Sequence, residues 1–94
     1  MKQREFEFDK NKSIINQNKH GISFEEAKLL WSDPNSLVVP AKIIDNEERY
    51  ALIGKINTKC YVAIFTLRAS KYRIISVRRC RKNEEKHYDQ SKRV

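Results

Sequence analysis

Residues 59–79 read KCYVAIFTLRASKYRIISVRR, two runs of β-branched and aromatic residues on either side of a polar turn. Such runs favour extended backbone, and the short turn at residues 68–71 predicts an antiparallel hairpin of strands at 59–67 and 72–79. In the register that this turn sets, Leu67 lies opposite Tyr72 and Thr66 lies opposite Arg73. The hairpin is therefore expected to form the centre of a sheet.

This register divides the hairpin's side chains between two faces. The first face is typical of core and holds Val62, Ile64, Ile75 and Val77. The second mixes aromatic, small, hydroxyl and guanidinium groups: Tyr61, Ala63, Phe65, Tyr72, Ile74, Ser76 and Arg78. Aromatic rings and arginines interleaved in this way suit a half-exposed surface that binds nucleic acid. We expect the second face to be open, although a slip of one residue would exchange the two faces.

Two helices are predicted before the sheet. Asp9 can cap a helix at residues 10–20, and Gly21 can end it in the left-handed conformation. Ser23-Phe24-Glu25-Glu26 forms a capping box that begins a second helix, which Asp33-Pro34 ends.

Further strands are expected at residues 36–44 and 48–54, and a charged helix anchored by Tyr88 at residues 81–92. The pattern predicts one α+β domain over residues 1–94: two N-terminal helices, a four-stranded antiparallel sheet and a C-terminal helix. The alternation at residues 6–8 leaves room for a short leading strand.

The positive charge is concentrated in the last third of the chain. The net charge is +8, and residues 68–94 alone carry 10 basic and 3 acidic side chains. A positive field of this kind suits a polyanion or an acidic protein, and the excess of arginine over lysine in this third favours phosphate recognition. The alternative is a solvated face that only keeps the protein soluble.

Several other classes of protein are disfavoured. The two cysteines, Cys60 and Cys80, match no zinc spacing, and the two glycines cannot form a phosphate-binding loop, so we expect no metal and no cofactor. No apolar segment is long enough to cross a bilayer, and the N-terminus lacks the apolar stretch of a secretory signal. We therefore expect a cytoplasmic protein whose thiols are reduced.

Cleavage of RNA without a metal needs a proton acceptor for the 2′-hydroxyl, cations on the phosphoryl oxygens and an acid for the leaving oxygen. The cations are expected among arginines of the hairpin: Arg68, Arg73, Arg78 and Arg79. The alternative for each is an exposed, partly stacked surface cation or a partner of Asp or Glu. His20 or Glu48 can exchange protons, although His20 can equally interact with its helix dipole and Glu48 can equally form an ion pair. The residues alone thus lead to a basic α+β domain that meets RNA or an acidic partner.

Three blocks of sequence, in the same order, resemble the BrnT toxins. They are Lys19-His20-Gly21-Ile22-Ser23-Phe24-Glu25-Glu26-Ala27 with Asp33-Pro34, then Glu47-Glu48-Arg49-Tyr50 through Ile53-Gly54, then Thr66-Leu67-Arg68 with residues 72–79 and a basic helix.

The resemblance implies a RelE-like fold and a ribonuclease toxin of a type II toxin–antitoxin system, which halts translation and growth. It further implies neutralisation by a BrnA-type ribbon-helix-helix antitoxin in a 2:2 complex that binds operator DNA. A non-catalytic module that binds RNA or acts as a corepressor is the alternative. The candidate catalytic residues are His20, Glu48, Arg68, Arg78 and Arg79, and the candidate RNA-binding residues are Lys19, Tyr61, Tyr72 and Arg73.

Overall fold

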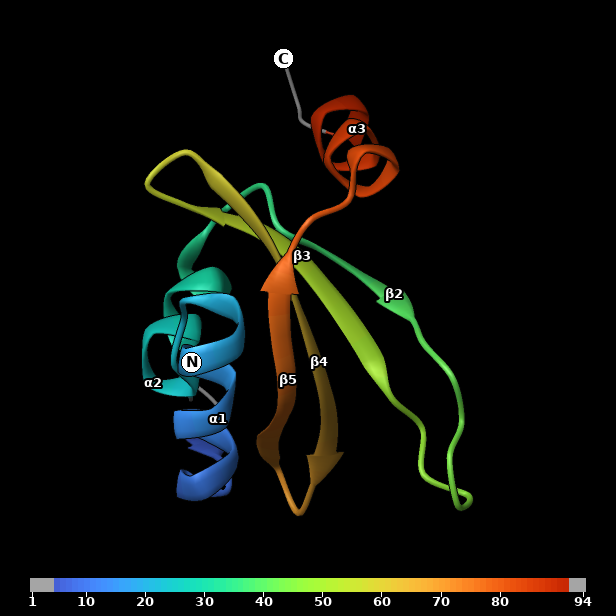
Figure 1. Ribbon diagram of the computed structural model, residues 1–94. Helices are drawn as coiled ribbons and strands as arrows, with labels where there is room; N and C mark the ends of the chain where they lie inside the picture. The colour runs from blue at the N-terminus through green and yellow to red at the C-terminus, as the bar shows by residue number, and fades with distance from the viewer. Residues whose placement is uncertain (1–4, 92–94) are drawn as a thin grey trace.

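The computed structural model describes residues 5–91 and places one sheet between helices on its two faces (Figure 1). The predicted end of the last helix, residue 92, lies outside this range, as do the ends of the predicted domain. The elements are, in chain order, β1 (Glu5–Glu7), α1 (Lys10–His20), α2 (Phe24–Ala27), the 3₁₀ helix η1 (Lys28–Ser32), β2 (Leu37–Pro40), β3 (Tyr50–Ile56), β4 (Lys59–Arg68), β5 (Lys71–Arg79) and α3 (Lys82–Ser91).

The sheet has five strands in the order β1-β5-β4-β3-β2. Neighbouring strands are antiparallel, except that β1 runs parallel to β5. The predicted α+β class is confirmed. The sheet is mixed and larger by one strand than the four predicted, because the leading strand is present and pairs with β5.

The predicted caps of the N-terminal helices are present. The side chain of Asp9 accepts hydrogen bonds from the backbone of Asn11 and Lys12, and Gly21 ends α1 at φ +76°. Ser23 and Glu26 form the capping box. The second helix then tightens into η1, so one predicted helix becomes a short α-helix followed by a 3₁₀ turn.

The β4–β5 hairpin contains a bulge that the sequence did not reveal. Leu67 pairs with Tyr72 and Thr66 with Arg73, as predicted. Beyond the bulge the register shifts by one residue, so that Ile64 pairs with Ser76 and Ala63 with Val77. An extra residue on one strand of a pair produces such a shift.

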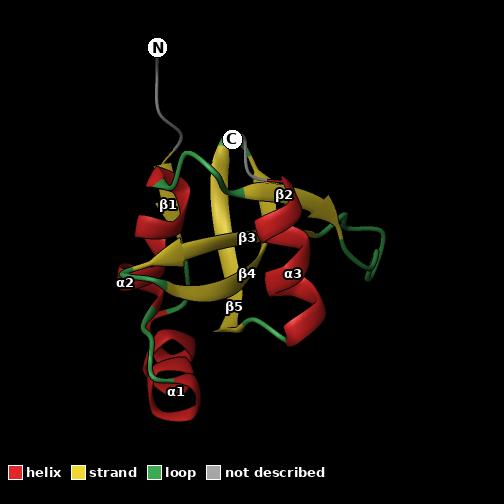
Figure 2. Cartoon of the chain, turned by 90° about the horizontal axis from the view of Figure 1, so that it is seen from above, coloured by secondary structure: helices red, strands yellow, loops and turns green. Residues whose placement is uncertain are grey.

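The bulge moves Ser76, Val77 and Arg78 to the faces opposite those predicted. The face expected to be open is also wrong, because the N-terminal helices cover it. Val77 joins Ala63, Phe65 and Ile74 in a core beneath α1, α2 and η1. Ala63, Phe65 and Ile74 were expected on the open second face, and Val77 was expected on the first face. Figure 2 shows α1 and α2 on one side of the sheet and α3 on the other.

The face toward α3 carries a second core cluster centred on Tyr88, the predicted anchor of that helix. Tyr88 is buried, and its hydroxyl donates to Asp33 at 2.7 Å. The same carboxylate accepts from the backbone N–H of Lys55 at 2.8 Å. Desolvation and the bond to Asp33 raise the pKa of Tyr88 to about 12.

Cys60 and Cys80 are joined by a disulfide, so the prediction of reduced thiols is wrong. Their Cα atoms lie 5.3 Å apart, within the range that a disulfide spans. The bulge explains the pairing. In the shifted register Tyr61 lies opposite Arg79. The residues next to this pair, Cys60 in β4 and Cys80 directly after β5, therefore lie opposite each other.

One buried asparagine joins α1 to the sheet. The Nδ2 atom of Asn16 donates to the carbonyl of Ile22 at 2.8 Å, and its Oδ1 atom accepts from the backbone N–H of Val77 at 3.1 Å. Both backbone groups are in the interior, where a lost partner leaves an unsatisfied polar atom.

We predict that Asn16→Ala lowers the free energy of unfolding by about 2–3 kcal/mol, because it orphans two buried backbone groups. Asn18→Ala on the exposed side of the same helix is the matched control and should have little effect. Urea denaturation of both variants measures the difference. Equal stabilities for the two variants would contradict the role given to Asn16.

Candidate active site

Three of the four predicted hairpin arginines share one face of the sheet. Cross-strand pairing places Arg68 beside Lys71, Thr66 beside Arg73, and Val62 beside Arg78, all on the side away from α1 and α2. Ser76 pairs with Ile64 on the same side. We call Thr66, Arg68, Arg73, Ser76 and Arg78 the arginine face.

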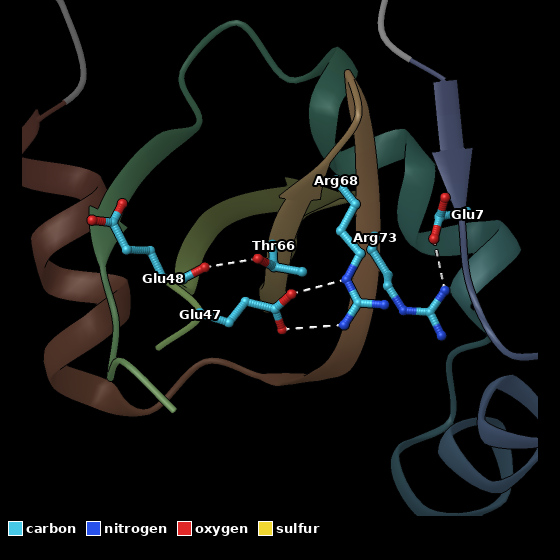
Figure 3. Close-up of polar contacts among 6 residues, drawn as sticks. All are labelled: Glu7, Glu47, Glu48, Thr66, Arg68 and Arg73. Atoms are coloured by element: carbon cyan, nitrogen blue, oxygen red, sulfur yellow. Dashed lines mark hydrogen bonds and ion pairs between the residues drawn. The ribbon is translucent and has the colours of Figure 1, made fainter. Parts of the chain in front are cut away.

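Arg68 is bound by Glu47 from the β2–β3 loop. Its Nε atom donates to Glu47 Oε2 at 2.8 Å and its Nη2 atom to Oε1 at 3.3 Å (Figure 3). The hydrogen bond from Arg68 lowers the pKa of Glu47 below its ordinary 4.5, and the charges of Arg49 and Arg73 lower this pKa further. Glu47 is therefore a carboxylate held among guanidinium groups.

Arg73 is bound by Glu7 from β1. Its Nη1 atom donates to Glu7 Oε2 at 2.8 Å, and both side chains are partly buried. The parallel pairing of β1 with β5 places Glu7 directly beside Arg73. Figure 3 shows the guanidinium groups of Arg68 and Arg73 next to each other, each with its own carboxylate.

Arg78 makes the most enclosed pair of the three. Its two terminal nitrogens donate to the two oxygens of Glu84 in α3 at 2.8 and 2.7 Å. Glu84 also accepts from the backbone N–H of Arg81 at 2.7 Å, at the start of that helix. The bond from Arg78 is the main reason why the pKa of Glu84 lies below its ordinary 4.5. This pair attaches α3 to β5 as well as holding a cation on the arginine face.

Glu48 does not face the arginines. Its carboxylate accepts from the hydroxyl of Tyr50 at 2.8 Å, and in Figure 3 it turns away from Arg68. Its carbonyl accepts from the buried hydroxyl of Thr66 at 2.7 Å, which fixes the end of the loop to β4. The carboxylate among the arginines is Glu47, which sequence reasoning missed. Adjacent residues point in different directions, and only the loop conformation decides between them.

Arg79, Tyr61 and Tyr72 lie on the face that the N-terminal helices cover. The guanidinium group of Arg79 stacks over the ring of Tyr61 at 5.4 Å, and its Nε atom donates to the carbonyl of Cys60. Tyr72 packs against Phe6 and other aromatic rings of that core. The structure thus places Arg68 and Arg73 next to each other, with Arg78 on the same face five residues further along β5. Arg79, Tyr61 and Tyr72 are on the other face.

Lys19 and His20 lie at the edge of the sheet. With Lys12 of the same helix they line a hollow of about 190 Å³ between α1 and the bulged part of β5. Ser76, a member of the arginine face, lines this hollow as well. The other members of the arginine face do not line the hollow, and their side chains lie on the side of the sheet away from α1. None of its lining residues is acidic.

The described residues hold neither a cluster of metal ligands nor a membrane-spanning helix. Within residues 5–91, no group of three or more His, Cys, Asp or Glu side chains is arranged to hold a metal ion. In the same range, every helix is too short or too polar to cross a membrane.

The sequence was then compared with known proteins. Residues 8–84 match the family model described as the ribonuclease toxin BrnT of type II toxin–antitoxin systems. The matched range contains all three arginines of the arginine face, together with Lys19 and His20. None of the curated proteins matches the chain significantly.

The Arg78–Glu84 pair predicts how stability depends on pH. Because folding lowers the pKa of Glu84, its contribution to stability is complete above about pH 4.5 and is lost as the pH falls through the folded-state pKa. The melting temperature of wild type should therefore fall more between pH 7 and pH 3.5 than that of Glu84→Gln. Glu85→Gln removes the same charge one residue along α3 and should follow wild type. Parallel pH curves for wild type and Glu84→Gln would refute this assignment.

Proposed function

Since this chain belongs to the BrnT family of ribonuclease toxins of type II toxin–antitoxin systems, we propose that it cleaves RNA on the arginine face without a metal ion. The match over residues 8–84 is the observation that carries the proposal. The arginine face supports it, because guanidinium forks bind phosphate in the same bidentate way as they bind carboxylate.

The proposed reaction uses a nucleophile that belongs to the substrate. The 2′-oxygen loses its proton and attacks the adjacent phosphorus, and the bond from phosphorus to the 5′-oxygen breaks. The 5′-oxygen takes up a proton, so the products are a 2′,3′-cyclic phosphate and a 5′-hydroxyl end. Arg68 and Arg73, whose guanidinium groups lie next to each other, would stabilise the charge that develops on the phosphoryl oxygens. Arg78, five residues further along β5, would bind another phosphate of the RNA backbone.

His20 is the better placed of the two predicted proton carriers. It lines the hollow that Ser76 also lines, and Lys19 in the same hollow is available to bind the RNA backbone. Glu48 is engaged by Tyr50 and turned from the arginines. Glu47 is poorly suited as a base, because Arg68 lowers its pKa and a weak base removes protons poorly.

Membership of this family implies an antitoxin partner and an RNA substrate. We propose that the antitoxin is a BrnA-type ribbon-helix-helix protein, that the complex is 2:2, and that it represses its own operon. The site of action would be the cytoplasm, where reductants would act on the Cys60–Cys80 disulfide.

We predict that Arg73→Ala reduces the rate of RNA cleavage by roughly 10²–10³, because it removes a donor from the developing charge, and that Arg78→Lys also reduces it, because it removes a bidentate contact to another backbone phosphate. Both variants should also relieve growth arrest when the chain is induced in bacteria. Cleavage of a defined RNA by purified protein measures the rates. Arg79→Ala is the matched control, because this neighbouring arginine lies on the other face.

Glu84→Gln separates catalysis from structure. It breaks the same ion pair but leaves Arg78 in place. If Glu84→Gln loses as much cleavage activity as Arg78→Lys, the role of Arg78 is only to hold α3 in place through its ion pair with Glu84. If folded wild type neither cleaves RNA nor arrests growth, the chain is instead a non-catalytic binding module.

The chemistry is tested by the substrate and by a chelator. We expect cleavage to persist in excess EDTA and to stop when the ribose at the scissile position is replaced by 2′-deoxyribose, since the attacking oxygen is then missing. Mass spectrometry of the products should find the cyclic phosphate. Activity that EDTA abolishes and added Mg²⁺ restores would refute the metal-free mechanism.

A further inference from the structure

The carboxylate of Glu47 lies in an anion site made of arginines from three segments. Arg68 donates hydrogen bonds to both of its oxygens. Arg49 and Arg73 lie close enough for their charges to act on it. The Nε atom of Arg49 is also buried, without a hydrogen-bond partner among residues 5–91. The charges of three arginines therefore act on this one carboxylate.

We propose that this site binds a backbone phosphate of RNA, and that Glu47 occupies the phosphate position until RNA displaces it. A carboxylate and a phosphate present similarly spaced oxygens to a guanidinium fork, so the two compete for the same donors. The inference rests on the proposed function for the identity of its ligand. It assigns to Glu47 the role of a built-in competitor of the substrate.

Exposure shows which of the three pairs exchanges most easily. The side chains of Arg68 and Glu47 are 51% and 29% exposed, whereas those of Arg78 and Glu84 are 27% and 19% exposed. An exposed ion pair contributes little free energy, so an incoming phosphate displaces it at low cost. The Arg78–Glu84 pair is held further by the backbone of Arg81.

The displaced carboxylate would stay near the site, because the loop backbone holds it there. Ile44 and Glu47 exchange two backbone hydrogen bonds across Asp45 and Asn46, both of which have positive φ. The hydroxyl of Thr66 fixes the next residue. Glu47 therefore continues to repel a bound phosphate, and removing its charge should strengthen RNA binding.

The test is the affinity for a single-stranded oligonucleotide whose 2′-hydroxyls are all replaced by hydrogen, so that it binds without being cleaved. We expect Glu47→Gln to bind it about two- to fivefold more tightly than wild type, the range that an exposed ion pair accounts for. Fluorescence anisotropy at fixed salt measures the affinity. The gain should disappear when Arg68→Gln is added to Glu47→Gln.

Glu48→Gln measures the general effect of removing one negative charge from the same loop, since its carboxylate contacts Tyr50 and no arginine. A gain in Glu47→Gln no larger than in Glu48→Gln, or one that persists with Arg68→Gln, would overturn the inference. If wild type cleaves RNA in that case, the proposed function stands. If Glu47→Gln gains affinity but no variant cleaves, the phosphate site stands and the nuclease proposal fails.

Discussion

The bulge in the β4–β5 hairpin determines most of what is particular to this fold. It moves the register by one residue, which places Val77 under the helices and Cys80 opposite Cys60. The same shift puts Ser76 and Arg78 on the face that carries Arg73. Without the extra residue, the second half of β5 would present its other side. The place of Arg78 on the arginine face and that of Val77 in the helix-covered core both depend on this single irregularity.

The sequence predicted the local structure well, because caps and turns are encoded by neighbouring residues. Asp9, Gly21 and the Ser23–Glu26 box act as expected. The pairing next to the β4–β5 turn was also predicted, since the turn length sets it. The bulge was missed because Ile74-Ile75-Ser76-Val77 fits either register equally well. This slip explains why Ser76, Val77 and Arg78 were assigned to the wrong faces and why Cys60 and Cys80 were not expected to meet. The second face was wrongly expected to be open because the residue pattern of a strand does not say which face the helices will cover.

The candidate site was harder to predict than the fold, because it is assembled from distant segments. Arginine-rich composition identified Arg68, Arg73 and Arg78, but not their partners Glu47, Glu7 and Glu84. These carboxylates come from a loop, an edge strand and the last helix. The net charge of +8 therefore overstates the field at this face, where each arginine is already neutralised by a partner. Local pairing, rather than total charge, decides what a polyanion meets there.

The position of β1 has a consequence for biosynthesis. β1 is translated near the start of the chain, yet its partner is β5, and the Glu7–Arg73 pair spans 66 residues. During translation α1 and α2 emerge before the strands that they cover, and β1 has no strand to join until β5 leaves the ribosome. Such long-range pairing forms slowly. A nascent toxin would thus acquire its complete sheet only after β5 has emerged.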